Sequence, residues 1–338
     1  MIAAMDEAGN PSSVHAEGRT AKGIVEKARG QVAALVGCEP SEIVFTSGAT
    51  EAAAVLGFAR WQGLDVLVDE SAHDALWAQV SVSQRADQEG RYVRAVGAAS
   101  GETGILVKPS LVAESDFAHG SGASATWLLL DICQLLGRVA FSFVEETAQF
   151  AIASAHKLGG PKGVGCLVVR QGVELAPLML GGGQEMGRRS GTENVIGIAG
   201  FGAAAGAAER DLANGEWDRV AEMRNGLEAM LLDAAPELIV FGKDVPRLPN
   251  TSNFAVPGWK GETQVMQMDL AGFAVSAGSA CSSGKVKESR VLRAMGFDSE
   301  TASSAIRISM GPTTTQAEVA AFAQTWIDHY RRFKRRAA

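Results

Sequence analysis

Residues 154–165 read Ser-Ala-His-Lys-Leu-Gly-Gly-Pro-Lys-Gly-Val-Gly, and this stretch says more about the fold than any other. The amine of Lys157 stands beside the hydroxyl of Ser154 and the imidazole of His156. An amine in this setting suits a Schiff-base cofactor, with the hydroxyl and imidazole as donors to a phosphate. The glycines let backbone and cofactor approach closely. The alternative is a glycine-rich turn with a solvated lysine.

Around this stretch, buried-looking strands alternate with helical or loop segments. We expect strands at 42–46, 64–68, 92–96, 127–130, 150–153 and 165–169. Such an alternation predicts an α/β protein with a mainly parallel sheet. Functional side chains are then expected at the carboxyl ends of the strands.

The character of the sequence changes near residue 195, where an Ala/Gly-rich helix is followed by a polar amphipathic helix near 214–234. Beyond residue 236, short strands mix with two terminal helices. We therefore expect a large cofactor-binding domain at 10–208. A smaller α+β domain is expected at 209–338, together with residues 1–9.

One of the four cysteines has an unusual setting. Cys281 lies in Ser-Ala-Gly-Ser-Ala-Cys-Ser-Ser-Gly at 276–284, a run of small residues that predicts a mobile surface loop. Cys38, Cys133 and Cys166 lie in or beside apolar segments, as small buried hydrophobes do. No Cys-x-x-Cys pair occurs, so neither a zinc site nor a dithiol motif is expected.

Three further residues could contact a cofactor ring. Asp131 ends the apolar run 127–130, where a carboxylate needs a partner such as a pyridinium nitrogen, or else caps a helix. Gln134 could reach the ring oxygen of the same ligand. His73 follows a strand and could stack on the ring, or simply be a surface histidine.

Two other positions suggest anion binding. Thr50, with the backbone of Gly48 and Ala49, begins a helix after a strand and glycine turn, and could bind a phosphate or act as a plain N-cap. Arg307 interrupts the alternating strand 305–309. It could bind a carboxylate in bidentate fashion or lie on an exposed strand face.

The bulk composition limits the classes of partner. The formal net charge of −7 argues against nucleic acid as the main ligand. No apolar stretch has the length of a membrane span, and the start lacks the pattern of a signal peptide. A cytoplasmic location is the default expectation.

Taken together, the motifs resemble those of the cysteine desulfurases of the NifS/IscS type, which have the class V aminotransferase fold. The matching runs are Gly-Asn-Pro-Ser-Ser-Val-His at 9–15, Thr-Ser-Gly-Ala-Thr-Glu at 46–51, residues 154–165, Gly-Gly-Gly-Gln-Glu at 181–185, Arg-Ser-Gly-Thr-Glu-Asn at 189–194 and Gly-Ser-Ala-Cys at 278–281. They span nearly the whole chain. The resemblance implies a type I PLP (pyridoxal 5'-phosphate) fold, whose large domain has a mainly parallel seven-stranded sheet.

The resemblance also implies a function for individual residues. PLP would be bound to Lys157, with Ala49, Thr50, His73, Asp131, Gln134, Ser154 and His156 around it. Thr192 would lie at the phosphate site of the partner subunit in a homodimer. L-cysteine, held by Arg307, would be converted to L-alanine, with His73 assisting proton transfer. Cys281 would carry the sulfur as a persulfide to an iron–sulfur assembly protein or another acceptor.

Two alternatives stay open: a lyase for selenocysteine or another sulfur amino acid, and a PLP-binding homologue that relays sulfur with little turnover. The chain departs from the family pattern in two places. Ser100-Gly101-Glu102 stands where the family has Asn-Asn-Glu, so the usual side-chain contact of the second Asn cannot form. Only eight residues precede Gly9, where the family has a longer segment that shapes the substrate site and dimer.

Overall fold

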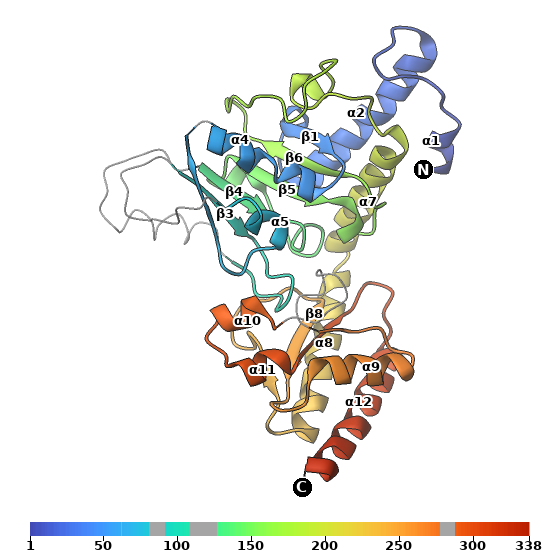
Figure 1. Cartoon of the computed structure of the whole chain (residues 1–338). Coiled ribbons are helices and arrows are strands. Elements are labelled where there is room, and N and C mark those ends of the chain that lie inside the picture. The colour runs from blue at the N-terminus through green and yellow to red at the C-terminus, as the bar shows by residue number, and fades with distance from the viewer. Residues whose placement is uncertain (62, 81–91, 108–126, 278–287, 338) are drawn as a thin grey trace. The chain divides into compact units, whose positions relative to one another are not determined.

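The computed structural model describes residues 1–61, 63–80, 92–107, 127–277 and 288–337. The chain forms two compact units (Figure 1). The first comprises Met1–Ala98 and Val107–Leu212, and the second comprises Ala99–Leu106 and Ala213–Ala338.

The first unit is built on a mostly parallel sheet, as the sequence predicts. Its described strands are β1 (Ile43–Thr46), β2 (Asp65–Val68), β3 (Tyr92–Gly97), β4 (Trp127–Asp131), β5 (Phe150–Ser154) and β6 (Gly165–Val169). Their order in the sheet is β1-β6-β5-β4-β3-β2. Six strands therefore come from the described residues, where seven were expected for the fold.

Strand directions decide where side chains can meet. Strands β2, β3, β4 and β5 are parallel neighbours, and β6 runs antiparallel to both β5 and β1. Strand β1 therefore points the same way as β5. The carboxyl ends of β1 to β5 and the start of β6 lie along one edge of the sheet.

Helices complete the first unit. They are α1 (Ile2–Met5), α2 (Ala16–Val36), α3 (Ala49–Ala52), α4 (Val55–Trp61), α5 (Asp74–Trp77) and α7 (Val195–Ala213), with short 3-10 turns η1 (Pro40–Glu42), η2 (Phe143–Glu145), η3 (Ala155–Lys157) and η4 (Glu185–Gly187). Helix α2 ends at Gly37, whose φ of 70° lets its N–H reach the carbonyls of the last turn. The glycines of α7 permit close helix packing, since a Cβ at Gly202 would lie 2.6 Å from Ala28 Cα of α2.

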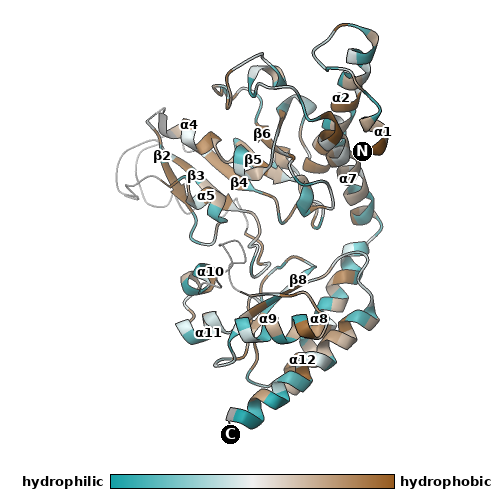
Figure 2. Cartoon of the chain, turned by 45° about the vertical axis from the view of Figure 1, so that its right-hand side comes forward, coloured by the Kyte–Doolittle hydropathy of each residue, from teal (hydrophilic) through white to brown (hydrophobic). Residues whose placement is uncertain are grey.

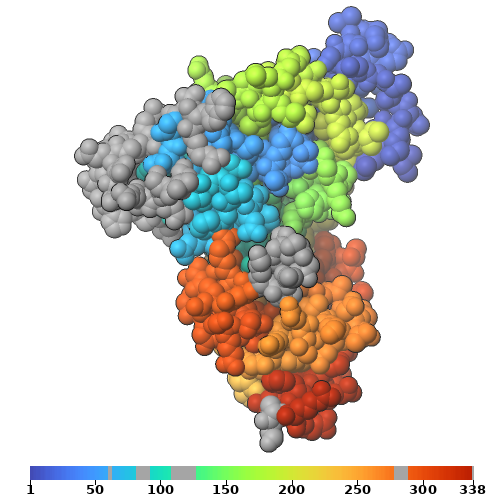
Figure 3. Space-filling view, viewed as in Figure 1, coloured from blue at the N-terminus to red at the C-terminus, as the bar shows by residue number. Residues whose placement is uncertain are grey.

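The N-terminal residues belong to the first unit, so their assignment to the smaller domain was wrong. A Cβ at Gly200 of α7 would lie 2.8 Å from Met1 Sδ and 2.9 Å from a Pro161 side-chain atom. Figure 3 shows the blue N-terminal residues against the yellow-green residues of α7. The apolar start of the chain packs there because small residues leave space along that helix.

The second unit has an antiparallel four-stranded sheet in the order β7-β8-β10-β9. Its elements are α8 (Glu216–Ala234), β7 (Ile239–Val240), β8 (Thr251–Ala255), α9 (Gly261–Leu270), β9 (Ser276–Ala277), α10 (Arg290–Ala294), α11 (Ser299–Ser303), β10 (Ala305–Ser309) and α12 (Gln316–Ala337). Trp326 of α12 is fully buried against Phe254 and Trp259. The last turns of α12 are hydrophilic (Figure 2) and carry the basic residues of the C-terminus.

A short segment after β3 lies in the second unit, whereas the expected division placed it in the large domain. Residues Ala99–Leu106 belong to the second unit although they follow β3 of the first. Leu106 N–H donates to Pro246 O at 2.9 Å, and Leu248 N–H donates to Gly104 O at 2.7 Å. These backbone bonds bind the segment to the chain before β8.

Among the residues that the structure describes, no helix combines the length and the apolar character that a membrane span requires.

Candidate active site

The predicted cofactor residues of the first unit gather along the carboxyl edge of its sheet. Asp131 is the last residue of β4, with Gly97 of β3 and Ile152 of β5 as its register partners. Lys157 lies three residues beyond the end of β5, and His73 lies five residues beyond the end of β2. Parallel strands thus bring together side chains that are far apart in sequence.

Lys157 closes the turn η3 and is half-buried. Ala155 N–H donates to Val164 O at 3.1 Å, and Gly160 N–H donates to Ala155 O at 2.9 Å. The guanidinium of Arg138 donates to the carbonyl oxygens of Lys157 and of Gln134. Arg138 thereby links the lysine turn to the chain that follows Asp131. This link was missed in the sequence, where its one signal was a basic residue within an apolar run.

Ser154 and His156 form a hydrogen-bonded pair beside the lysine. Ser154 Oγ lies 2.8 Å from His156 Nδ1, and the serine is buried while the histidine is exposed. Partial burial lowers the pKa of His156, and the charges of Lys157 and Lys162 lower it further. The imidazole is therefore neutral at pH 7, and an anion bound beside it would favour its protonation.

Asp131 makes a local bond at the strand end. Its Oδ1 accepts from Cys133 N–H at 3.0 Å, and the side chain is half-buried. This is a turn-type contact: residues 133–138 form turns and not a helix, so Asp131 is not a helix N-cap. Gln134 is also half-buried. The carboxylate lies at the end of β4 and the amide in the turn that follows, where both remain compatible with a ring ligand.

His73 caps α5. Its Nδ1 accepts from Ala75 N–H at 3.1 Å, and the ring is exposed. Capping fixes the ring orientation with Nδ1 as an acceptor. The surface-histidine and ring-stacking interpretations are both consistent with this position.

Thr50 and Ala49 begin α3 beside Ser154. A Cβ at Gly165 would lie 2.8 Å from Gly48 Cα and 2.5 Å from Ala153 O, so only glycine permits this approach. The Cβ position of Gly48 is 3.9 Å from Ser154 Oγ. The turn that carries Thr50 therefore adjoins the Ser154–His156 pair. Backbone N–H groups, hydroxyls and an imidazole converge there, a donor set suited to a phosphate.

Thr192 is exposed in a glycine-rich segment between η4 and α7. Together with Ser47 and Arg189 it lines a cavity of about 190 Å³. The first unit therefore brings the Thr192 segment next to the turn that precedes Thr50. The ion pair between Arg189 and Glu51, with Nε and Oε1 2.9 Å apart, had no signal in the sequence that we used.

Arg307 lies in the second unit, on β10 opposite Asn253 of β8. Its Nη1 donates to Gly101 O at 2.5 Å and its Nη2 to Ser276 Oγ at 3.3 Å. The side chain is half-buried rather than exposed. A guanidinium held in this way is oriented before any carboxylate binds.

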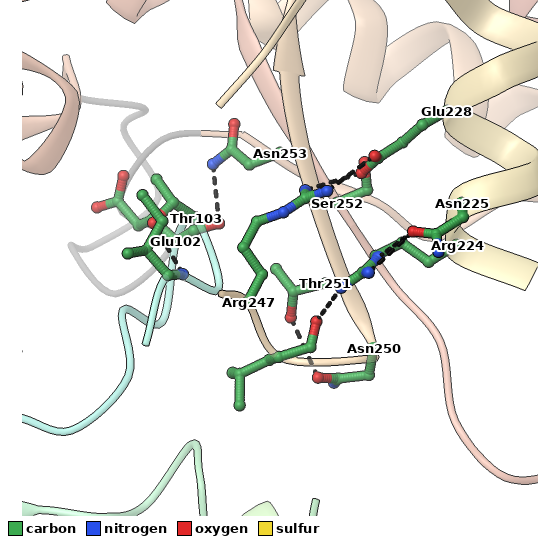
Figure 4. Close-up of polar contacts among 12 residues, drawn as sticks. Glu102, Thr103, Arg224, Asn225, Glu228, Arg247, Asn250, Thr251, Ser252 and Asn253 are labelled. Atoms are coloured by element: carbon green, nitrogen blue, oxygen red, sulfur yellow. Dashed lines mark hydrogen bonds and ion pairs between the residues drawn. The ribbon is translucent and has the colours of Figure 1, made fainter. Parts of the chain in front are cut away.

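The Ser100–Gly104 turn is fixed by its own hydroxyl and by Asn253 of β8, whose bond to Glu102 is drawn in Figure 4. Ser100 Oγ accepts from Thr103 N–H at 3.1 Å, and Ser100 is buried. Asn253 Nδ2 donates to Glu102 O at 2.9 Å. Ser100 therefore stabilises the turn, and the departure from the family pattern leaves a backbone carbonyl at Gly101 as the contact to Arg307.

A buried ion pair holds the chain before β8. Arg247 donates to both carboxylate oxygens of Glu228 at 2.8 and 2.9 Å, and Ser252 Oγ donates to Glu228 Oε1 at 2.7 Å (Figure 4). Bidentate geometry with an added hydroxyl satisfies the buried carboxylate. The strand that carries Asn253 is thereby fixed relative to α8.

Cys281 lies outside the described residues, so the structure does not describe its loop. The other cysteines are poor nucleophiles. Burial raises the pKa of the Cys166 thiol to about 12, and burial with the nearby Asp131 raises that of Cys133 well above the ordinary value. Burial also raises the pKa of Cys38, which is half-buried. Within the described part of the chain, no cluster of three metal-ligating side chains occurs.

The chain is similar to known proteins along most of its length. The model of the family "Aminotransferase class-V" matches residues 3–93 and 62–322. A cysteine desulfurase of Klebsiella pneumoniae is 36% identical over 337 residues, covering 92% of this chain and 83% of that protein. One of Frankia sp. (strain EuIK1) is 38% identical over 349 residues, covering 92% and 82%.

Solved structures agree with this similarity. A NifS-like protein of Rickettsia africae ESF-5 superposes with a TM-score of 0.86 at 27% identity, covering 98% of this chain and 94% of that one. A second NifS-like protein superposes with a TM-score of 0.83 at 30% identity, covering 96% and 92%. The type I fold expected from the sequence is thus confirmed.

The residues at the sheet edge fit pyridoxal phosphate. An amine, a carboxylate and a cluster of anion donors lie on neighbouring strand ends, and the close approach of Gly48 to Gly165 brings the turn before Thr50 against the strand beside Ser154. These are the groups that a pyridine ring with an aldehyde and a phosphate requires. The chain belongs to the aminotransferase class-V family, and its activity is that of the family's PLP-dependent cysteine desulfurases.

Proposed function

We propose that the protein converts L-cysteine to L-alanine and transfers the sulfur to Cys281, with PLP attached to Lys157. One observation carries this proposal: Lys157, Asp131 and the Ser154–His156 pair lie at the carboxyl edge of one parallel sheet. The similarity to cysteine desulfurases over most of the chain supports it.

Each residue would have a separate task. Ser154, His156, Thr50 and the Ala49 backbone hold the phosphate, and Asp131 holds the proton on the pyridine nitrogen. Gln134 contacts the ring oxygen. PLP, when bound, withdraws electrons from the substrate Cα. The amine of Lys157, released when the amino group of the substrate replaces it on the cofactor, would take the proton from Cα, and His73 would assist proton transfer beside the ring.

Arg307 binds the substrate carboxylate. Its guanidinium is oriented by Gly101 O and by Ser276 Oγ, so less side-chain entropy is lost when the carboxylate binds. Because Arg307 is half-buried, the ion pair with the substrate is less screened than on an open surface.

Cys281 takes the sulfur. Its thiolate attacks the substrate sulfur, so a sulfur–sulfur bond forms while the bond between Cβ and sulfur breaks. Cβ receives a proton, and the products are alanine and a persulfide on Cys281. Cys133 and Cys166 are excluded from this role because burial keeps both protonated.

The protein would act as a cytoplasmic homodimer in which Thr192 serves the phosphate site of the partner subunit. The persulfide would be passed to an iron–sulfur assembly protein or another sulfur acceptor. The net charge of −7 and the relatives' activity support a protein acceptor rather than nucleic acid.

The deciding experiment measures alanine and sulfide from cysteine. Cys281→Ser should keep the visible PLP band and lose alanine formation, whereas the matched control Cys38→Ser should keep both. Mass spectrometry after cysteine addition should find one added sulfur on the Cys281 peptide. Alanine formation by Cys281→Ser at the wild-type rate without added thiol would instead indicate a simple lyase. Turnover of selenocysteine alone would indicate the corresponding selenium enzyme.

A further inference from the structure

The turn before Thr50 and the segment that carries Thr192 are joined by one ion pair. Arg189 Nε lies 2.9 Å from Glu51 Oε1, and Arg189 Nη2 lies 3.5 Å from Oε2. The two side chains are 20% and 18% exposed, so the pair is largely shielded from solvent. Such a pair is stronger than one on an open surface.

Glu51 also holds the phosphate turn itself. Its Oε2 accepts from Ser47 N–H at 2.7 Å. Burial raises the pKa of Glu51, but the hydrogen bonds from Arg189 and Ser47 outweigh this and leave the pKa below its ordinary value. The carboxylate of Glu51 therefore contacts both segments. A displacement of either segment would change the position of the other through this carboxylate.

The Thr192 segment is fixed at its other end. Glu185 accepts from Arg29 Nη1 and Nη2, each at 2.9 Å, and from Phe45 N–H at 2.8 Å. Glu185 and Met186 have φ of 49° and 58°, a conformation that non-glycine residues keep only when contacts hold them there. With this end fastened to β1 and with Ser190 N–H bonded to Met179 O, the Glu51–Arg189 pair ties the segment, three residues before Thr192, to the phosphate turn.

We propose that Glu51 and Arg189 are positioning residues that couple the two cofactor sites of a dimer. A phosphate bound at the Ser47–Thr50 turn of one subunit would stabilise Glu51. Glu51 would then hold Arg189, and so place Thr192 for the phosphate of the partner. Binding of PLP at one site would thus strengthen binding at the other. The inference rests on the proposed function, which puts Thr192 at the partner's site.

The test uses heterodimers with one live site, purified through two different tags. One chain, the dead chain, carries Lys157→Ala, and the other, the live chain, keeps its lysine. Only the site of the live chain therefore fixes PLP on borohydride reduction. Arg189→Gln is placed in either chain, and the PLP concentration for half-maximal labelling is measured. Coupling predicts that both placements weaken labelling, each by roughly tenfold. In the live chain, Arg189→Gln would disturb the Ser47 turn of the live site. In the dead chain, the same variant would displace Thr192, which serves the phosphate of the live site.

An effect from one placement alone would overturn the coupling, because the ion pair would then support one segment and not both. Glu51→Gln, which retains an acceptor for Ser47 N–H, should reproduce the effect of the dead-chain Arg189→Gln. Arg188→Gln is the matched control, since Arg188 bonds to Ser41 O and not to Glu51. The melting temperature of each apo dimer should stay near that of the parent, which separates positioning from loss of folding.

Thr192→Ala distinguishes failure of this inference from failure of the proposed function. In the dead chain it should weaken labelling of the live site, and in the live chain it should not. The reverse pattern would refute the placement of Thr192 across the dimer, and the coupling with it. The expected Thr192 pattern with a one-sided Arg189 effect would refute the coupling alone.

Discussion

Arg307 Nη1 lies 2.5 Å from the carbonyl oxygen of Gly101, although the two residues are 206 positions apart in the chain. The arginine is thus held by backbone at the position where the family pattern has an asparagine side chain. A carbonyl contact does not depend on residue type, so glycine can occupy this position without leaving Arg307 unsupported.

We predict that Arg307→Lys raises the KM for cysteine by roughly tenfold or more, because an ammonium group cannot bind a carboxylate in bidentate fashion. The visible PLP band should not change. Steady-state kinetics with an absorption spectrum measures both. Arg331→Lys, on the exposed face of α12, is the matched control and should leave KM unaltered. An unchanged KM in Arg307→Lys would remove this arginine from substrate binding.

We predict that borohydride reduction fixes PLP on Lys157 and not on Lys162. Lys157 lies in the turn beside Ser154 and His156, whereas Lys162 lies farther along the glycine-rich run and is exposed. Peptide mapping by mass spectrometry locates the label. Lys157→Ala should carry no covalent label after reduction and dialysis, whereas Lys162→Ala should retain it. Label on Lys162 in the wild type would refute the assignment.

We predict that Ser100→Ala lowers the free energy of unfolding by about 1–2 kcal/mol, because it leaves buried N–H groups of the turn without an acceptor. The serine is buried and its Oγ accepts from Glu102 N–H and Thr103 N–H. Urea denaturation of the apo protein gives the change. Ser303→Ala, whose exposed hydroxyl bonds to a carbonyl within its own helix, should change stability much less.

We predict that alkylation at pH 8 modifies Cys281 long before Cys133 or Cys166. A thiol pKa of about 12 leaves Cys166 almost wholly protonated at that pH. Time-resolved iodoacetamide labelling with peptide mapping follows each cysteine. All four should react once the protein is unfolded in guanidinium. Early modification of Cys166 in the folded protein would contradict the burial of its thiol.

We predict that His156 contributes to the loss of stability in acid. Its pKa in the folded state is lowered, so the unfolded chain binds the proton first as the pH falls below about 6.5. Above that pH both states are neutral and the effect vanishes. His156→Gln should therefore flatten the decline of the apo protein's unfolding midpoint between pH 7 and pH 5. An unchanged slope would show that the histidine titrates normally.

Local patterns in the sequence predicted the elements and the main cofactor residues. The polar helix expected near 214–234 is α8, Glu216–Ala234, and the expected strand at 165–169 is β6. Both follow from apolar periodicity and from glycine at the ends, which act over a few residues. The run around Lys157 is equally local, so the sequence alone could predict a role in cofactor binding without the fold.

Tertiary structure alone decided which distant polar groups meet. The sequence does not show that Glu51 binds Arg189 or that Glu185 binds Arg29, because single charged residues carry no periodicity and pair with whichever partner the fold brings near. The Ala99–Leu106 excursion was hidden for the same reason. Its backbone bonds to Pro246 and Leu248 do not depend on side-chain type, and so they leave no pattern in the sequence.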